Sequence, residues 1–167
     1  MAEAVIVDAV RTPIARGKPI VGDLNGFHAA ELLALSIREI VTRSGIDFKD
    51  IEYLAGGCVT QAGEQSSNVT RTAWLSMNEG YHPGATTLDN QCGSAQTANH
   101  MLSSMITTGS FDIGIACGVE SMSRVQMGSN VYNGPGTYQP SKWEWDTVPN
   151  QFIHAERIAH KRGLTRE

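Results

Sequence analysis

Short apolar runs that alternate with helical patterns are the feature of this 167-residue sequence that most limits its fold. The runs have the length of buried strands and span residues 4–10, 51–59, 85–89 and 112–119. Between them, apolar residues recur at helical spacing over residues 28–44, 67–77 and 97–108. Strands that are apolar throughout and separated by helices are typical of a parallel or mixed sheet covered on both faces. The sequence therefore predicts an α/β fold in the order β-α-β-α-β-α-β.

The character of the chain changes after Ser123. Residues 130–149 are rich in Gly, Pro, Tyr, Trp and Asn and show no clear period, which is typical of a long loop that covers a site. Helical spacing returns over residues 152–161, and Gly163 follows as a stop signal. We therefore predict an α/β region over residues 1–123 and a lid region over residues 124–167.

Composition excludes several classes of function. A formal net charge of −4 offers no basic surface for nucleic acid or for an anionic membrane. No window approaches the roughly 18 apolar residues of a membrane span, and the N-terminus lacks the pattern of a signal peptide. The three cysteines have no CxxC spacing, so we expect neither a disulfide framework nor a metal site. These features together favour a reducing, cytoplasmic setting.

Cys92 lies between a predicted strand and a helix of small residues. At the start of a helix the first N–H groups lack intrahelical partners, and the helix dipole favours an anion. The thiolate is the nucleophilic form of cysteine, so this position predicts nucleophilic catalysis by Cys92. The backbone N–H groups of Cys92 and Gly93 are the expected donors to the oxyanion that forms during attack.

The remaining candidate residues are given less direct roles. Cys58 and Cys117 lie within apolar strands, where a cysteine normally packs as a small apolar side chain. Glu120 directly follows the last predicted strand, and we expect it to orient a catalytic loop rather than to transfer protons. None of the five histidines lies in a motif that would pair it with Cys92, and His100 lies about two helical turns beyond it.

Four stretches carry a resemblance to a known family. Residues 89–95, Asp-Asn-Gln-Cys-Gly-Ser-Ala, resemble the nucleophilic-cysteine motif of thiolases, which form or cleave 3-ketoacyl-CoA. Residues 7–14 resemble the opening strand and turn of that family, and residues 56–61 resemble its second strand. Residues 118–123 resemble its Gly-x-Glu-x-Met-Ser signature. In this order the stretches are similar to the N-terminal half of a thiolase.

The resemblance implies a mixed, mostly parallel sheet with helices on both faces and part of an inserted lid domain. It implies an acyl-CoA C-acyltransferase that cleaves 3-ketoacyl-CoA to acetyl-CoA and a shortened acyl-CoA, or runs the reverse Claisen condensation, in lipid or steroid degradation. Coenzyme A would be a substrate, with no covalently bound cofactor. In the family, the lid segment that corresponds to Asn150, Gln151 and Phe152 lines the coenzyme A cleft. Family members are homodimers or homotetramers.

The sequence also departs from the family. The later motifs Asn-Glu-Ala-Phe, Gly-His-Pro-x-Gly and Cys-Gly-Gly, which supply the activating base and a second catalytic cysteine, are absent from these 167 residues. We therefore expect this chain to be inactive alone. It would be a truncated or proteolysed thiolase, or one half of a split enzyme whose second chain supplies the missing part.

Two other functions remain open. One is a different condensing enzyme of the same superfamily, such as a β-ketoacyl synthase, against which the Glu-x-Met-Ser pattern argues. The other is a non-catalytic lipid carrier or scaffold that keeps the fold. The complete motif around Cys92 argues against that reading.

Overall fold

The computed structural model describes residues 3–132, 134–144 and 150–167. The chain divides into two compact units, Met1–Gly134 and Pro135–Glu167, which are described separately. The larger unit contains α1 (Ala29–Ser44), β1 (Tyr53–Gly57), α2 (Val69–Met77), β2 (Gly84–Leu88), α3 (Ser94–Thr107), β3 (Gly114–Gly118) and α4 (Ser129–Tyr132), with short 3-10 turns at Phe48–Asp50 and Gly63–Gln65. The smaller unit contains α5 (Gln151–Arg162).

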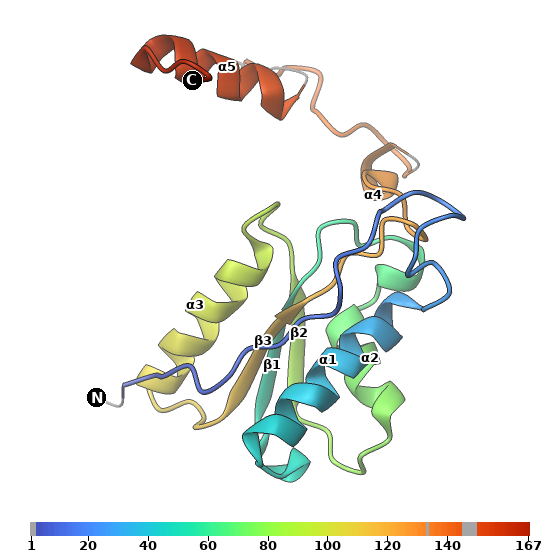
Figure 1. Ribbon diagram of the computed structural model, residues 1–167, viewed down its shortest axis with the longest axis vertical. Coiled ribbons are helices and arrows are strands. Elements are labelled where there is room, and N and C mark those ends of the chain that lie inside the picture. Colours follow the sequence, from blue (N-terminus) through green and yellow to red (C-terminus); the bar gives the residue numbers. More distant parts are fainter. Residues whose placement is uncertain (1–2, 133, 145–149) are drawn as a thin grey trace. The chain divides into compact units, whose positions relative to one another are not determined.

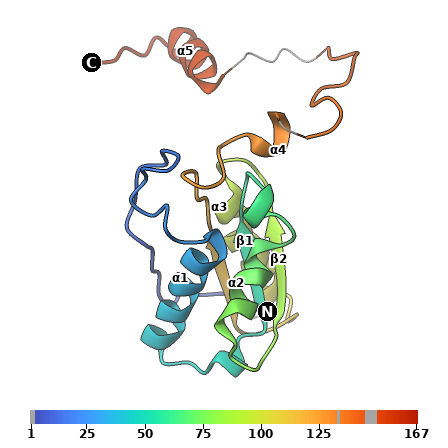
Figure 2. The same ribbon diagram turned by 90° about the vertical axis from the view of Figure 1, so that its right-hand side faces the viewer.

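The sheet has the order β2-β1-β3, and both strand pairs are parallel. Helices α1 and α2 pack side by side on one face, and α3 covers the opposite face (Figures 1 and 2). This arrangement confirms the predicted α/β fold with helices on both faces of the sheet. The parallel direction has a functional consequence, because the carboxyl ends of all three strands meet at one edge.

The core on the α1 face follows from the helical spacing of apolar residues. Leu33, Ile37 and Val41 recur at intervals of one helical turn, so they share one face of α1 and are buried. They pack in one cluster with Leu54 of β1 and Trp74 of α2. The helix begins at a capping box between His28 and Glu31 and ends at Gly45, whose φ of 71° is left-handed.

Two successive glycines allow helices to approach β1 from opposite faces. A Cβ at Gly56 would lie 2.0 Å from Thr70 Oγ1 of α2, and a Cβ at Gly57 would lie 2.5 Å from the backbone nitrogen of Ala95 in α3. Neighbouring residues of a strand point to opposite faces, so the pair serves both layers at once. A side chain at Gly57 would push α3 away from the sheet, and a side chain at Gly56 would displace the side chain of Thr70.

The first predicted strand is wrong for this structure. Residues 4–10 have no regular secondary structure, and the exposed fractions of Val5, Ile6 and Val7 are 74%, 82% and 80%. β3 is the last strand in the sheet order, so among the described residues no strand pairs with its outer edge. An extended segment becomes a strand only when a neighbour takes its backbone hydrogen bonds. The apolar pattern of residues 4–10 predicts a strand but cannot indicate whether a neighbouring strand is there to pair with it.

Helix α3 is less covered than its composition predicts. Few charged residues and many small ones indicate a helix packed on both sides, but the structure buries only one face, through Ser94, Ala98 and Leu102. Gln96, Asn99 and Ser103 are exposed. The buried face packs against the sheet and against Phe111, which lies in the loop after α3.

The smaller unit is described by α5. The side chain of Asn150 caps it by accepting a hydrogen bond from Ile153 N–H at 3.2 Å, and Gly163 ends it with a φ of 61°. The two units divide after Gly134, and Arg124 binds Glu64 within the larger unit. The predicted boundary after Ser123 between an α/β region and a lid region stays a prediction. Residues 133 and 145–149 of the predicted lid lie outside the described part of the chain. None of the described helices is both long and apolar enough to cross a bilayer.

Candidate active site

The candidate site lies where the three strands end. Gly57, Leu88 and Gly118 are aligned in the parallel register and close β1, β2 and β3. The segments that follow them therefore leave the sheet at the same edge, with Cys58 N–H donating to the Leu88 carbonyl and Val119 N–H to the Gly57 carbonyl, each at 3.0 Å. Open parallel sheets place their reactive groups at this edge.

Cys92 is exposed and lies in the turn between β2 and α3. Gly93 is the N-cap of α3, and Ser94 is its first residue. Cys92 thus precedes the N-cap of a helix of 14 residues, close to the helix start that the sequence predicts. This placement leaves Cys92 exposed at the carboxyl edge of the sheet.

The turn around Cys92 is closed by short-range hydrogen bonds. Gly93 N–H donates to the Asn90 carbonyl at 3.1 Å, and Gln91 N–H donates to Asp89 Oδ1 at 2.8 Å. The expectation that Gly93 N–H serves an oxyanion therefore meets a competing bond within the turn. Gln91 has a φ of 50°, a left-handed conformation that costs free energy in a residue with a Cβ.

The other two cysteines are poor nucleophiles at neutral pH. Burial, followed by the hydrogen bond and negative charge of Glu120, raises the pKa of Cys58 to about 12. Burial alone raises the pKa of Cys117 to about 12. Both groups remain thiols near pH 7, in keeping with the packing role predicted for them.

Glu120 ties the ends of β1 and β3 together. Its Oε1 accepts hydrogen bonds from Val59 N–H at 2.7 Å and from Thr60 N–H at 2.9 Å, and it lies 3.3 Å from Cys58 Sγ. The carboxylate thus satisfies backbone donors of the loop that leaves β1.

Gln65 is a functional neighbour that sequence reasoning missed. It is fully buried, its Nε2 donates to the Thr60 carbonyl at 2.8 Å, and its Oε1 accepts from Ser121 N–H at 2.7 Å. A single glutamine in a polar loop carries no pattern that predicts burial. It reinforces the connection that Glu120 makes, because both link the segment after β1 to the segment after β3.

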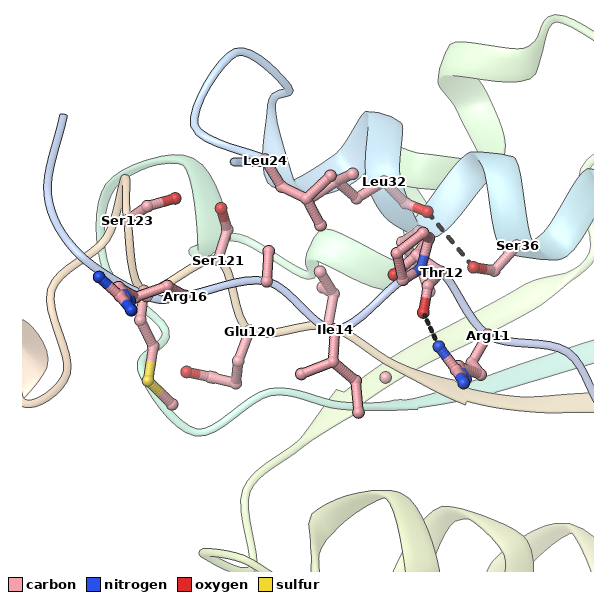
Figure 3. Close-up of a pocket in the computed structure, with 17 residues that line it drawn as sticks. Arg11, Thr12, Ile14, Arg16, Leu24, Leu32, Ser36, Glu120, Ser121 and Ser123 are labelled. Atoms are coloured by element: carbon pink, nitrogen blue, oxygen red, sulfur yellow. Dashed lines mark hydrogen bonds between the residues drawn. The ribbon is translucent and has the colours of Figure 1, made fainter. Parts of the chain in front are cut away.

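A cavity of about 500 Å³ lies beside Glu120 but does not include Cys92. Figure 3 shows Glu120 and Ser121 from the segment after β3, opposite Ile14 of the N-terminal segment and Leu32 of α1. Ser121 Oγ is buried and has no hydrogen-bond partner among the described residues. The cavity therefore lies on the α1 side of the sheet, whereas Cys92 begins the helix on the other side.

The described residues give Cys92 no histidine partner. His28 caps α1 by accepting a hydrogen bond from Ala30 N–H at 3.1 Å, and His100 is an exposed residue within α3. No hydrogen bond joins a histidine to the Cys92 sulfur among the described residues, and no group of three or more metal-ligating side chains occurs there.

The three residues predicted to contact coenzyme A lie in the smaller unit. Asn150 caps α5, Gln151 is its first residue, and the exposed fraction of Phe152 is 74%. They are adjacent at the start of one helix. Their contact with coenzyme A stays a prediction.

Comparisons with known proteins identify the family. A model of the thiolase N-terminal domain matches residues 4–167. The steroid 3-ketoacyl-CoA thiolase FadA6 of Mycobacterium tuberculosis is 33% identical over 100% of this chain and 42% of its own length. A 3-ketoacyl-CoA thiolase of Shewanella frigidimarina is 38% identical, with the same coverage of each chain.

A solved structure shows the same fold. The Acat5 thiolase from Ascaris suum, crystallised in complex with coenzyme A, superposes with a TM-score of 0.75 at 24% identity. The match covers 99% of this chain and 44% of that one. The chain thus spans less than half the length of the relatives it matches. It belongs to the thiolase family and corresponds to the N-terminal domain.

Proposed function

We propose that this chain is the nucleophile-bearing part of a 3-ketoacyl-CoA thiolase, with Cys92 as the catalytic residue. The main support for this proposal is that Cys92 is exposed at the start of α3, at the edge where three parallel strands end. Cys58 and Cys117 are excluded by a pKa raised to about 12. The names of the relatives support a 3-ketoacyl-CoA as substrate, in fatty-acid or steroid degradation.

In this reaction the Cys92 thiolate attacks the C3 keto carbon of the substrate. The C2–C3 bond then breaks, and its electron pair stays on C2 of the departing acetyl-CoA, which takes up a proton. The acyl group remains on Cys92 as a thioester. The thiolate of free coenzyme A attacks this thioester, releases the shortened acyl-CoA and restores the Cys92 thiolate. The reverse condensation begins from an acetyl group on Cys92.

The attack needs a donor that stabilises the oxyanion, and steady turnover also needs a base that activates the thiol. Since Gly93 N–H already donates to Asn90, the backbone N–H of Cys92 is our candidate for stabilising the oxyanion. The activating base would come from a polypeptide segment outside these 167 residues, because the described part of the chain brings no histidine to Cys92. The relatives are more than twice as long, which leaves room for such a segment.

Glu120 has a positioning role in this proposal. It holds Val59 and Thr60 at the edge where Cys92 lies, and its carboxylate helps to keep Cys58 protonated. Asn150, Gln151 and Phe152 would contact coenzyme A. The exposed face of α3 is compatible with a homodimer or homotetramer, which sedimentation velocity would detect.

Acyl transfer to the protein tests the proposal. The purified chain is incubated with acetyl-CoA, and the acetylated peptide is identified by mass spectrometry. We expect acetylation at Cys92 that Cys92→Ala abolishes and that Cys117→Ala leaves intact. Acetylation that persists in Cys92→Ala would refute the role of Cys92. A wild-type chain that takes up no acetyl group would favour the carrier or scaffold function.

Turnover is a separate measurement. Without an activating base, the 167-residue chain should show no steady thiolysis of 3-ketoacyl-CoA. Steady turnover that disappears in Cys92→Ala would show that these residues alone supply the base.

A further inference from the structure

The hydroxyl of Ser94 forms two hydrogen bonds within the turn that contains Cys92. Ser94 is the first residue of α3 and is only 4% exposed. Its Oγ accepts a hydrogen bond from Asn90 N–H at 2.9 Å and donates one to the Gln91 carbonyl at 2.5 Å. Ser94 N–H donates to the same carbonyl at 3.0 Å. One residue therefore binds both of the residues that immediately precede Cys92.

The hydrogen bonds from Ser94 stabilise an unfavourable backbone conformation at Gln91. Gln91 has a φ of 50°, and a non-glycine residue keeps a left-handed conformation only when its surroundings hold it there. Two of the bonds that hold it end on its carbonyl and come from Ser94. A third joins its N–H to Asp89 Oδ1. The direction in which the chain enters Cys92 thus depends directly on Ser94.

Ser94 packs against Gly57 of the sheet. A Cβ at Gly57 would lie 2.8 Å from Ser94 Cβ and 2.5 Å from the Ala95 backbone nitrogen. Gly57 is the last residue of β1, so the first turn of α3 packs directly against the carboxyl edge of the sheet. The Ser94 hydroxyl is therefore fixed relative to β1, and its hydrogen bonds fix the turn relative to the same strand.

We propose that Ser94 is a positioning residue for the nucleophile, holding the Cys92 backbone so that the thiol stays at the start of α3. The inference rests on the proposed function of Cys92 and adds a residue that touches neither substrate nor the reacting atoms. Alanine at position 94 fits the same space but removes both hydroxyl bonds. Gln91 can then leave its left-handed conformation, and Cys92 moves away from its position at the start of α3.

The test compares the rate at which iodoacetamide alkylates Cys92 at neutral pH in three proteins. These are the wild-type chain, Ser94→Ala, and Ser103→Ala as a matched control, since Ser103 is an exposed serine of the same helix. We expect Ser94→Ala to slow alkylation at least about tenfold at neutral pH, because it removes two hydrogen bonds that each contribute a modest net stabilisation. Ser103→Ala should match the wild-type rate.

The outcomes separate the two proposals. A wild-type Cys92 that reacts no faster than an unstructured cysteine peptide would count against the proposed function. A reactive wild type with equal rates in Ser94→Ala and Ser103→Ala would overturn the role of Ser94 alone. Amide hydrogen exchange on the wild-type chain gives a reading that needs no variant. Asn90 N–H should exchange slowly because Ser94 Oγ accepts it, and fast exchange there would also overturn the inference.

Discussion

Glu64 and Arg124 form a two-pronged ion pair in which Arg124 Nε and Nη2 donate to separate oxygens of the carboxylate, each at 2.8 Å. The same Glu64 accepts a hydrogen bond from Ala29 N–H at the start of α1, and Arg124 donates to the Asn25 carbonyl. The pair thus connects the segment after β3 to the helix on the α1 face. Planar pairs of this kind fix orientation as well as distance.

The first prediction concerns acid stability. The hydrogen bonds from Arg124 hold the pKa of Glu64 below its usual 4.5 despite partial burial. A lowered pKa in the folded state means that the ionised carboxylate stabilises the protein at higher pH and that this contribution is lost as the pH falls through the folded pKa. Glu64→Gln should therefore lower the melting temperature near pH 7 and have progressively less effect below about pH 4. Glu39→Gln, at an exposed position of α1, is the control. An equal effect of Glu64→Gln at both ends of the pH range would contradict the prediction.

The second prediction concerns Gly57. Because a Cβ there would lie 2.5 Å from a backbone nitrogen of α3, Gly57→Ala must displace the helix. We expect a loss of about 1–3 kcal/mol in the free energy of unfolding, as overpacking normally costs, together with slower alkylation of Cys92. Gly26→Ala is the matched control, since a Cβ at Gly26 would meet no atom within 4 Å. Chemical denaturation measures the first effect. Equal stability of the two variants would show that α3 can shift at no cost.

The third prediction concerns cysteine selectivity. N-ethylmaleimide at pH 7 to 8 should label Cys92 rapidly and leave Cys58 and Cys117 unlabelled until the protein is denatured. The physical reason is that both thiols have a pKa raised to about 12, so their thiolate fraction is very small in this range. Peptide mass spectrometry before and after denaturation measures the order of labelling. Early labelling at Cys58 would be inconsistent with the packing described for it.

The fourth prediction concerns Glu120. Replacing it by glutamine removes the carboxylate whose hydrogen bond with Cys58 and, after it, whose negative charge raise the pKa of Cys58 most after burial. Glu120→Gln should therefore lower the pKa of Cys58 and increase its labelling at pH 9. Glu52→Gln is a suitable control, because the Glu52 carboxylate binds Asp112 N–H and Ile113 N–H at the opposite end of the same strands. Cys58 labelling that is unchanged in Glu120→Gln, or equally raised in Glu52→Gln, would argue against the contact.

Much of the fold could be predicted from local pattern. The strands of β1, β2 and β3 and the helices α1, α2, α3 and α5 lie within a few residues of the ranges that their periodicity predicts. The place of Cys92 at the start of α3 follows from the same reading, since a strand, a polar turn and a run of small residues succeed one another there. These elements depend on residues that are close in sequence, so the local pattern of apolar and polar residues is enough to predict them.

The rest depends on contacts between distant residues. Residues 4–10 look like a strand but have no partner strand among the described residues, and apolarity alone cannot supply one. The burial of Gln65 arises from its bonds to Thr60 and Ser121, the second of which lies 56 positions further along the chain. Arg124 joins the larger unit for the same kind of reason, through Glu64. No local signal records such pairings.

The glycine pair of β1 makes the strand intolerant of slippage. Moving β1 by one residue would exchange the faces of all its side chains, so Ala55 or Cys58 would take the place of a glycine beneath a helix. The methyl group of Ala55, in the place of Gly56, would clash with the hydroxyl of Thr70. The side chain of Cys58, in the place of Gly57, would clash with the backbone at the first turn of α3. The absence of two side chains therefore selects a single register for β1, and this register also determines where Cys92 lies relative to the sheet.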